Sequence, residues 1–209
     1  MFAPQVKTPR VKICGLTRAE DALATEQAGA DAIGLMFVAN SKRYLEMTKA
    51  QEVVSLLGPF VARVGVFRNA SLETILETIE KVGLNAVQLN GQETDDFAAQ
   101  VAKVRPVIRA VSFTKNLELP KNDALLVDGV DPGSGQTFDW NALETAQLGH
   151  RRWLLAGGLN PENVAAAVRQ LRPWGVDVSS GVEASAGIKD PELVRAFIER
   201  AKMALETQA

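Results

Sequence analysis

Two residues in this sequence have side chains that could move protons, and each stands near the end of a short apolar run. Cys14, the only cysteine among 209 residues, lies in VKICG, and Asp128 lies in ALLVDG. A thiolate is a good general base when its pKa is brought down from about 8.5. A carboxyl group that an apolar or anionic setting keeps protonated is a general acid. The alternatives are a buried apolar role for Cys14 and a cap or turn role for Asp128.

Two glycine-rich segments predict a site for an anion. AGGLNPENV and VSSGVEASAG follow the last two apolar runs and contain Gly157, Gly158, Ser180 and Gly181. Glycine lets backbone N–H groups come close to an anion, and α/β barrels commonly bind phosphate after their last two strands. Tight turns without a ligand are the alternative. Arg43, in NSKRYL, carries a planar fork that suits a carboxylate or a phosphate.

Further polar side chains near the ends of apolar runs complete the candidate site. They are Gln88, Arg109 and Asp177, which we expect to face the same pocket. The segment DPGSGQTFDW (131–140) is small and rich in glycine in its first half, as a lid over such a pocket would be.

The elements that must position these residues alternate along the chain. Apolar runs typical of buried strands occur at 11–15, 32–37, 60–67, 86–90, 107–113, 124–129, 153–159 and 175–181. Helical patterns lie at 19–29, 71–83, 160–171 and 190–206. We expect Ser71, Asn160 and Asp190 to be the N-caps of the last three helices.

Alternating strands and helices make the strands parallel, with crossover connections between them. The chain therefore has an α/β pattern that predicts a single-domain (β/α)8 TIM barrel over residues 1–209, with its active site at the carboxyl ends of the strands. A doubly wound open sheet is the alternative, but it normally carries G-x-G-x-x-G where this chain has ICGLTR. TKNLELPKND (114–123) is short and rich in Pro and Asn, so we expect an irregular or missing fifth helix.

Composition excludes several classes of function. The net charge is -2 and there is no run of Lys and Arg, which argues against nucleic acid as a partner. The apolar runs are too short to cross a membrane, and the N-terminus does not resemble a signal peptide. One cysteine cannot form an internal disulfide, and one histidine (His150) argues against a zinc site. We expect a monomer in the cytoplasm.

Longer motifs run from Lys12 to the last predicted helix. They are KICGLTR, GADAIGLMF followed by SKRYL, RVGVF, AVQLNG, GSGQTFDW, GGLNPENV and DVSSGVE. In this order and spacing they resemble the phosphoribosylanthranilate isomerase family. The resemblance implies a (β/α)8 barrel and an Amadori rearrangement of a small phosphorylated substrate, N-(5-phosphoribosyl)anthranilate, in tryptophan biosynthesis, without a cofactor.

The resemblance also implies roles for individual residues. It makes Cys14 the general base and Asp128 the general acid. It places the anthranilate carboxylate on Arg43, and the phosphate on backbone amides around Gly157–Gly158 and Ser180–Gly181.

Other functions compete with this interpretation. The similar sugar isomerase of histidine synthesis has Asp where this chain has Cys14, and activity on both substrates stays open. A barrel that binds a phosphorylated ligand without turnover is a second alternative. A thiol redox sensor is a third, although the chain has no second cysteine to resolve an oxidised thiol.

Overall fold

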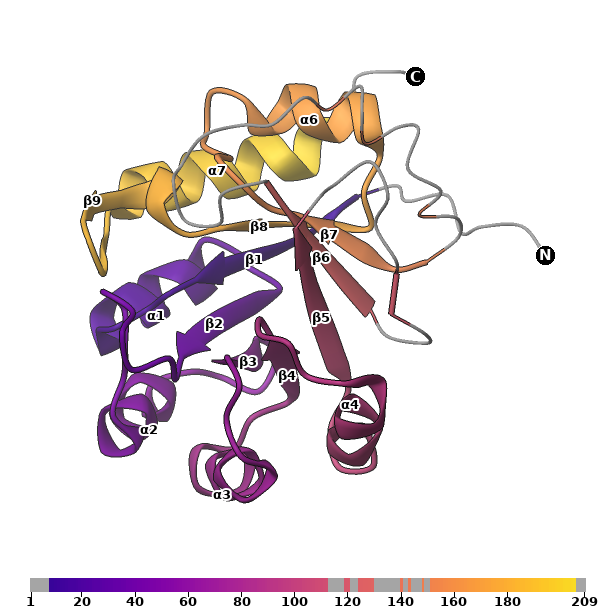
Figure 1. The fold of residues 1–209 in the computed structure, drawn as a ribbon. Helices are drawn as coiled ribbons and strands as arrows, with labels where there is room; N and C mark the ends of the chain where they lie inside the picture. Colours follow the sequence, from indigo (N-terminus) through magenta and orange to yellow (C-terminus); the bar gives the residue numbers. More distant parts are fainter. Residues whose placement is uncertain are drawn as a thin grey trace.

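Eight parallel strands form a closed barrel in which each strand pairs with the next and β8 pairs with β1 (Figure 1). This is a computed structural model, and it describes residues 8–112, 119–120, 124–129, 140, 143, 148 and 151–205. The barrel strands are β1 (Arg10–Cys14), β2 (Ala32–Met36), β3 (Ala62–Phe67), β4 (Ala86–Leu89), β5 (Val107–Ser112), β6 (Ala124–Asp128), β7 (Trp153–Leu155) and β8 (Gly175–Val178). The predicted (β/α)8 barrel is confirmed.

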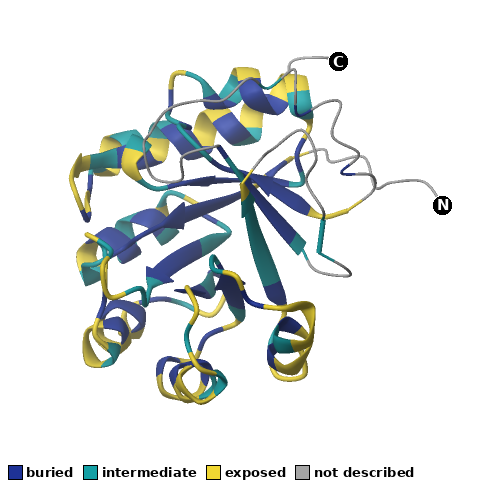
Figure 2. Cartoon of the chain, viewed as in Figure 1, coloured by how far each residue is buried: buried dark blue, intermediate teal, exposed yellow. Residues whose placement is uncertain are grey.

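Helices surround the barrel and bury one face each against the strands, as the alternation of buried and exposed turns in Figure 2 shows. They are α1 (Ala19–Gln27), α2 (Met47–Ser55), α3 (Leu72–Val82), α4 (Asp95–Ala102), α6 (Val164–Leu171) and α7 (Pro191–Met203). Helices α2 and α4 were not predicted. Each buries only a few small or β-branched side chains, among them Ala50 and Val53 in α2 and Ala98 and Val101 in α4, so their apolar stripes are weak in the sequence.

Local sequence explains where the helices begin and end. The Ser71 hydroxyl accepts a hydrogen bond from the N–H of Thr74, and the Asp190 carboxylate accepts from those of Glu192 and Leu193, as expected of N-caps. The prediction for Asn160 is wrong by one turn, because α6 begins at Val164. The Asn160 side chain instead caps a separate turn, accepting from the N–H groups of 162 and 163.

A short hairpin follows β8 and was not predicted. A 3₁₀ turn, η1 (Ser180–Val182), leads into β9 (Glu183–Ser185) and β10 (Ile188–Lys189), which pair antiparallel. The strands are only three and two residues long, so they carry almost no periodic signal in the sequence. The hairpin projects beyond the barrel beside α1, and its last residue leads directly into α7 (Figure 1).

Strand residues alternate between the barrel interior and the side that faces the helices. On β1, Val11 and Ile13 belong to the core beneath the helices, whereas Lys12 and Cys14 point into the barrel. On β6, Leu126 lies in a cluster inside the barrel, and Asp128, two residues later, shares its side. The two residues proposed for proton transfer therefore face the interior at the carboxyl ends of their strands.

Some predictions fall on residues that the structure leaves out. Most of the fifth-helix segment (114–118 and 121–123), all of the candidate lid except its last residue (131–139) and His150 lie outside the described residues. In the described part of the chain, no helix has both the length and the apolar character that a membrane span needs.

Candidate active site at the carboxyl ends of the barrel strands

Cys14 ends β1 as a buried free thiol, and the neighbouring strand is shaped to accept it. Gly34 of β2 is its register partner. A Cβ atom at Gly34 would lie 2.6 Å from Cys14 Sγ, which is closer than real Cβ contacts come. The sulfur therefore occupies space that a larger residue on β2 would fill, and it stays inside the barrel.

A buried ion pair lies beside the thiol. Lys12 and Asp177 are register partners on β1 and β8, and Lys12 Nζ lies 2.6 Å from Asp177 Oδ1, with 2% and 10% of the two side chains exposed. Burial by itself would lower the pKa of Lys12, but the Asp177 carboxylate and the sulfur of Cys14 together outweigh burial and raise it. Lys12 is therefore a fixed positive charge two residues from Cys14.

Charges around Cys14 act in opposite directions on its pKa. Burial raises the pKa of the thiol, and the Asp177 carboxylate adds to the rise. The ammonium groups of Lys12 and Lys189 oppose it, because they favour the thiolate. The site thus holds a buried sulfur whose negative form has two cations near it.

Asp128 is a carboxyl group set to hold a proton. Burial, with a smaller contribution from Asp177, raises the pKa of Asp128 from 3.8 to about 6, and the hydrogen bond from Gly129 N–H and the charge of Lys12 oppose the rise. That N–H donates to Asp128 Oδ1 over 2.8 Å, so the turn role considered from sequence is also present. A pKa near neutrality suits a general acid.

The two glycine-rich segments lie against each other and against Asp128. Gly157 and Gly158 both have positive φ, 84° and 64°. A Cβ atom at Gly157 would lie 2.8 Å from Asp128 Oδ1, and one at Gly181 would lie 1.9 Å from the carbonyl oxygen of Leu159. These close approaches require glycine, and they bring the ends of β6, β7 and β8 into one place.

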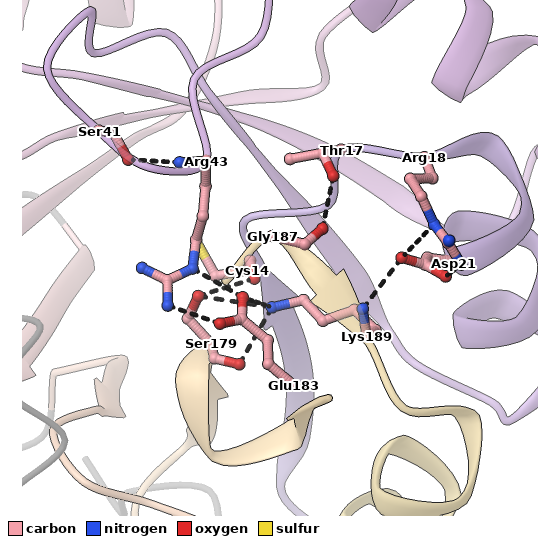
Figure 3. A network of polar contacts seen from close by, with 10 residues as sticks. All are labelled: Cys14, Thr17, Arg18, Asp21, Ser41, Arg43, Ser179, Glu183, Gly187 and Lys189. Atoms are coloured by element: carbon pink, nitrogen blue, oxygen red, sulfur yellow. Dashed lines mark hydrogen bonds and ion pairs between the residues drawn. The ribbon is translucent and has the colours of Figure 1, made fainter. Parts of the chain in front are cut away.

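Arg43 does not extend freely from its loop (Figure 3). Its Nε and Nη2 atoms donate to the two oxygens of Glu183, both at 2.7 Å, and Lys189 Nζ lies 2.8 Å from Glu183 Oε1. Lys189 also donates to the carbonyl oxygen of Ser179, whose hydroxyl donates to the carbonyl oxygen of Cys14. A network of buried charge thus links the loop after β2 to the hairpin after β8 and to the end of β1.

The remaining predicted residues lie at different places. Gln88 faces the barrel interior, where Nε2 donates to Asn90 Oδ1. Arg109 alternates with inward-facing Ile108 and Ala110 on β5, so it faces the helices. There it donates to the carbonyl oxygen of Glu93. The structure brings Gln88 to the interior side but does not bring Arg109 there.

Sequence reasoning missed three charged residues of the site, namely Lys12, Glu183 and Lys189. Lys12 had a detectable signal, because a lysine inside a buried strand, on the same face as Cys14, needs a partner within the fold. Glu183 and Lys189 belong to a hairpin with no periodic pattern, so only the folded chain shows that they meet Arg43.

Known proteins match nearly the whole chain. The family model for N-(5'phosphoribosyl)anthranilate (PRA) isomerase matches residues 11–200. The chain belongs to this family. The N-(5'-phosphoribosyl)anthranilate isomerase of Thermotoga neapolitana is 47% identical over 201 residues, which are 92% of this chain and 98% of that protein. This family membership makes the protein an isomerase of tryptophan biosynthesis.

Solved structures of the family have the same fold. The crystal structure of phosphoribosyl anthranilate isomerase from Thermotoga maritima superposes with a TM-score of 0.87 at 43% identity, covering 93% of this chain and 98% of that one. A second crystal structure, of the isomerase in complex with reduced 1-(o-carboxyphenylamino)-1-deoxyribulose 5-phosphate, gives a TM-score of 0.84 at 42% identity, with the same coverage. The family resemblance in the sequence is therefore confirmed.

Proposed function

We propose that the protein converts N-(5-phosphoribosyl)anthranilate to 1-(2-carboxyphenylamino)-1-deoxyribulose 5-phosphate by an Amadori rearrangement, with Cys14 as general base and Asp128 as general acid. The observation that carries the proposal is the buried Lys12–Asp177 pair, whose charges act on the pKa of both residues at one end of the barrel. The related structure in complex with a reduced form of this product supports the choice of substrate.

The proposed steps start from a protonated Asp128 and from Cys14 as a thiolate, the form that the ammonium groups of Lys12 and Lys189 favour against the effect of burial on its pKa. Asp128, partly protonated near neutral pH, gives its proton to the ring oxygen of the ribose, and the ring opens to a Schiff base. Cys14, as the thiolate, removes the proton from C2′. The electrons move to the anthranilate nitrogen, which acts as the electron sink. The enolamine then tautomerises to the ketone. Cys14 releases the proton it has taken and Asp128 regains one by exchange with water, so protons and electrons balance without a cofactor.

Substrate recognition uses charges and backbone at the rim of the barrel. Arg43 binds the carboxylate of the anthranilate, and the glycine segments at 157–158 and 180–181 bind the phosphate through backbone N–H groups. The first N–H groups of the 3₁₀ turn at Ser180 have no partner within the turn, which favours an anion there. Gln88 lines the pocket from the interior.

Asp177 was expected to bind the substrate, but the proposal gives it an electrostatic role instead. Its carboxylate is engaged by Lys12, so in this proposal it acts on the proton-transfer residues through its charge. A single domain, a monomeric state and a cytoplasmic location stay predictions.

The decisive experiment follows the fluorescence decay of freshly made phosphoribosylanthranilate after the purified protein is added. We expect rapid decay with the wild type, and turnover reduced by roughly 10²–10⁴-fold in Cys14→Ala and in Asp128→Asn, as for lost general acids and bases. Lys49→Ala, an exposed change on α2, is the control and should leave the rate unchanged.

Two results would contradict the proposal. Near-normal turnover in Cys14→Ala would show that the thiol is not the base. No decay with the wild-type protein would reject this substrate, and the sugar phosphate of histidine synthesis would then be tested.

A further inference from the structure

We infer that Glu183, on the hairpin that follows β8, is a positioning residue that holds the Arg43 guanidinium in place for a carboxylate on the substrate. The inference rests on the proposed function, because it takes that carboxylate to be the group that Arg43 binds. Glu183 does not touch the substrate in this inference, and it acts through Arg43 alone.

The contact between the two side chains fixes the guanidinium in a plane. Two parallel hydrogen bonds of 2.7 Å join Nε and Nη2 of Arg43 to Glu183, whose side chain is only 5% exposed. Such a paired contact sets both distance and orientation. Nη1 donates to none of the residues that the structure describes, so the outer edge of the fork, formed by Nη1 and Nη2, is left for a second carboxylate (Figure 3).

The stem of Arg43 is confined as well. A Cβ atom at Gly15, the residue after Cys14, would lie 2.4 Å from Arg43 Cδ. The aliphatic part of the side chain therefore runs over Gly15 at close range, while Glu183 holds its far end. With both ends held, little conformational entropy is left for a ligand to remove.

Lys189 prevents Glu183 from cancelling the charge of Arg43. Its ammonium, on a side chain that is 1% exposed, lies 2.8 Å from Glu183 Oε1. Glu183 and Lys189 together have no net charge, so the three side chains keep the single positive charge of Arg43. A carboxylate that arrives at the outer edge of the fork therefore meets a net cation.

The hairpin is tied to the loop after β1 and to the first turn of α1 by contacts that involve no ligand. The backbone N–H of Lys189 donates to Asp21 Oδ2, and the Thr17 hydroxyl donates to the carbonyl oxygen of Gly187. Arg18 holds the same Asp21 carboxylate from the other side (Figure 3). Glu183 therefore lies on a hairpin that is held in place by contacts with Thr17 and Asp21.

Positioning and simple charge predict opposite effects when Glu183 is neutralised. Glu183→Gln removes a negative charge near the substrate, so charge alone would make a carboxylate bind more tightly. If Glu183 positions Arg43, the same change loosens the fork and weakens binding. The sign of the effect distinguishes the two.

The test measures the binding of two ligands by calorimetry. One is reduced 1-(o-carboxyphenylamino)-1-deoxyribulose 5-phosphate, and the other is the matched phenylamino compound without the carboxyl group. For Glu183→Gln we expect about tenfold weaker binding of the first ligand, as for a lost hydrogen bond between charged groups, and unchanged binding of the second. A merely structural defect would weaken both alike.

Asp21→Asn is the matched control, because it disturbs the same hairpin without touching Arg43. We expect its preference for the carboxylated ligand to equal that of the wild type. An equal loss of preference in Asp21→Asn, tighter binding of the carboxylated ligand in Glu183→Gln, or an unchanged preference in Glu183→Gln would each overturn the inference.

Arg43→Met separates this inference from the proposed function. If Arg43→Met keeps the full preference for the carboxylated ligand, the proposed carboxylate site itself fails. If Arg43→Met loses that preference and Glu183→Gln keeps it, the carboxylate site stands and only the positioning role is rejected.

Discussion

Two groups of paired charge lie near Cys14 in the described part of the chain, and they are built differently. Inside the barrel, Lys12 and Asp177 form a simple pair between neighbouring strands. At the rim, Arg43, Glu183 and Lys189 form a group of three that joins a loop to a hairpin. Among the described residues, the interior carboxylate has one cation as partner, and the rim carboxylate has two.

The difference in the number of cations corresponds to the different roles that we propose for the interior pair and for the rim group. Burial raises the pKa of Cys14 and of Asp128, and on both groups Asp177 adds to the rise while Lys12 opposes it, so in the proposed function the interior pair bears on proton transfer. The rim group leaves a net positive charge beside an unused edge of Arg43, and so it bears on recognition. A charge in the interior needs its partner because no solvent replaces it, whereas the group of three can lose either cation and still keep the carboxylate of Glu183 paired.

The largest expected effect comes from removing the interior cation. Lys12→Met leaves the Asp177 carboxylate buried without its ion-pair partner, so we expect the free energy of unfolding to fall by about 3–5 kcal/mol. Urea denaturation measures the change. Lys12→Met/Asp177→Asn is the matched control and should recover most of the loss, because it also removes the unpaired charge. A loss below about 1 kcal/mol in Lys12→Met would show that the pair is not buried as described.

Asp128 gives a third case to compare with Asp177 and Glu183, because its carboxyl group is partly buried but has no ion-pair partner among the described residues. Its pKa is raised to about 6 in the folded state, from an ordinary 3.8. The unfolded chain therefore loses the proton first, and stability falls as the pH rises from about 4 to 6. Above that range we expect Asp128→Asn to raise the free energy of unfolding by about 3 kcal/mol.

The pH dependence checks the sign of this gain. Below pH 4 both states of the wild type hold the proton, so the advantage of Asp128→Asn should vanish there. Thermal unfolding of both proteins between about pH 3 and pH 8 measures the difference. A gain that is constant across this range, or that grows toward acid, would contradict a raised pKa for Asp128.

The smallest expected effect is at the rim. Arg43→Met leaves Glu183 paired with Lys189, so we expect the free energy of unfolding to fall by only about 1 kcal/mol. The same urea measurement serves for this variant and for Lys12→Met. If Arg43→Met were as damaging as Lys12→Met, the rim group would be no more tolerant than the interior pair, and the distinction drawn between the two places would fail.

Sequence periodicity was sufficient for the barrel but not for all of its helices. The strand runs were correctly placed because buried parallel strands are almost wholly apolar. Helix α4 was missed because it buries few residues, and the start of α6 was misplaced because Asn160 caps a turn of its own. Local chemistry predicts that a cap will form, but the packing of the following residues decides which element it caps.

Some residues of the candidate site could likewise be predicted from the sequence, and others could not. Cys14, Asp128 and the glycine segments could be selected from the sequence, because strand ends and glycine runs are local features. Arg109 could not be placed, because its face depends on the register of β5, which is invisible in the residue itself.

The sequence by itself determined the family and the barrel, and it was enough to propose Cys14 and Asp128 for proton transfer, since each of these inferences depends on motifs and periods that neighbouring residues carry. Only the tertiary structure decided how the charges are partnered. Lys12 meets Asp177 across 165 positions of chain, and Arg43 meets Glu183 across 140. The physical reason is that closing the barrel sets β8 beside β1, and no local pattern records which side chains this closure brings together.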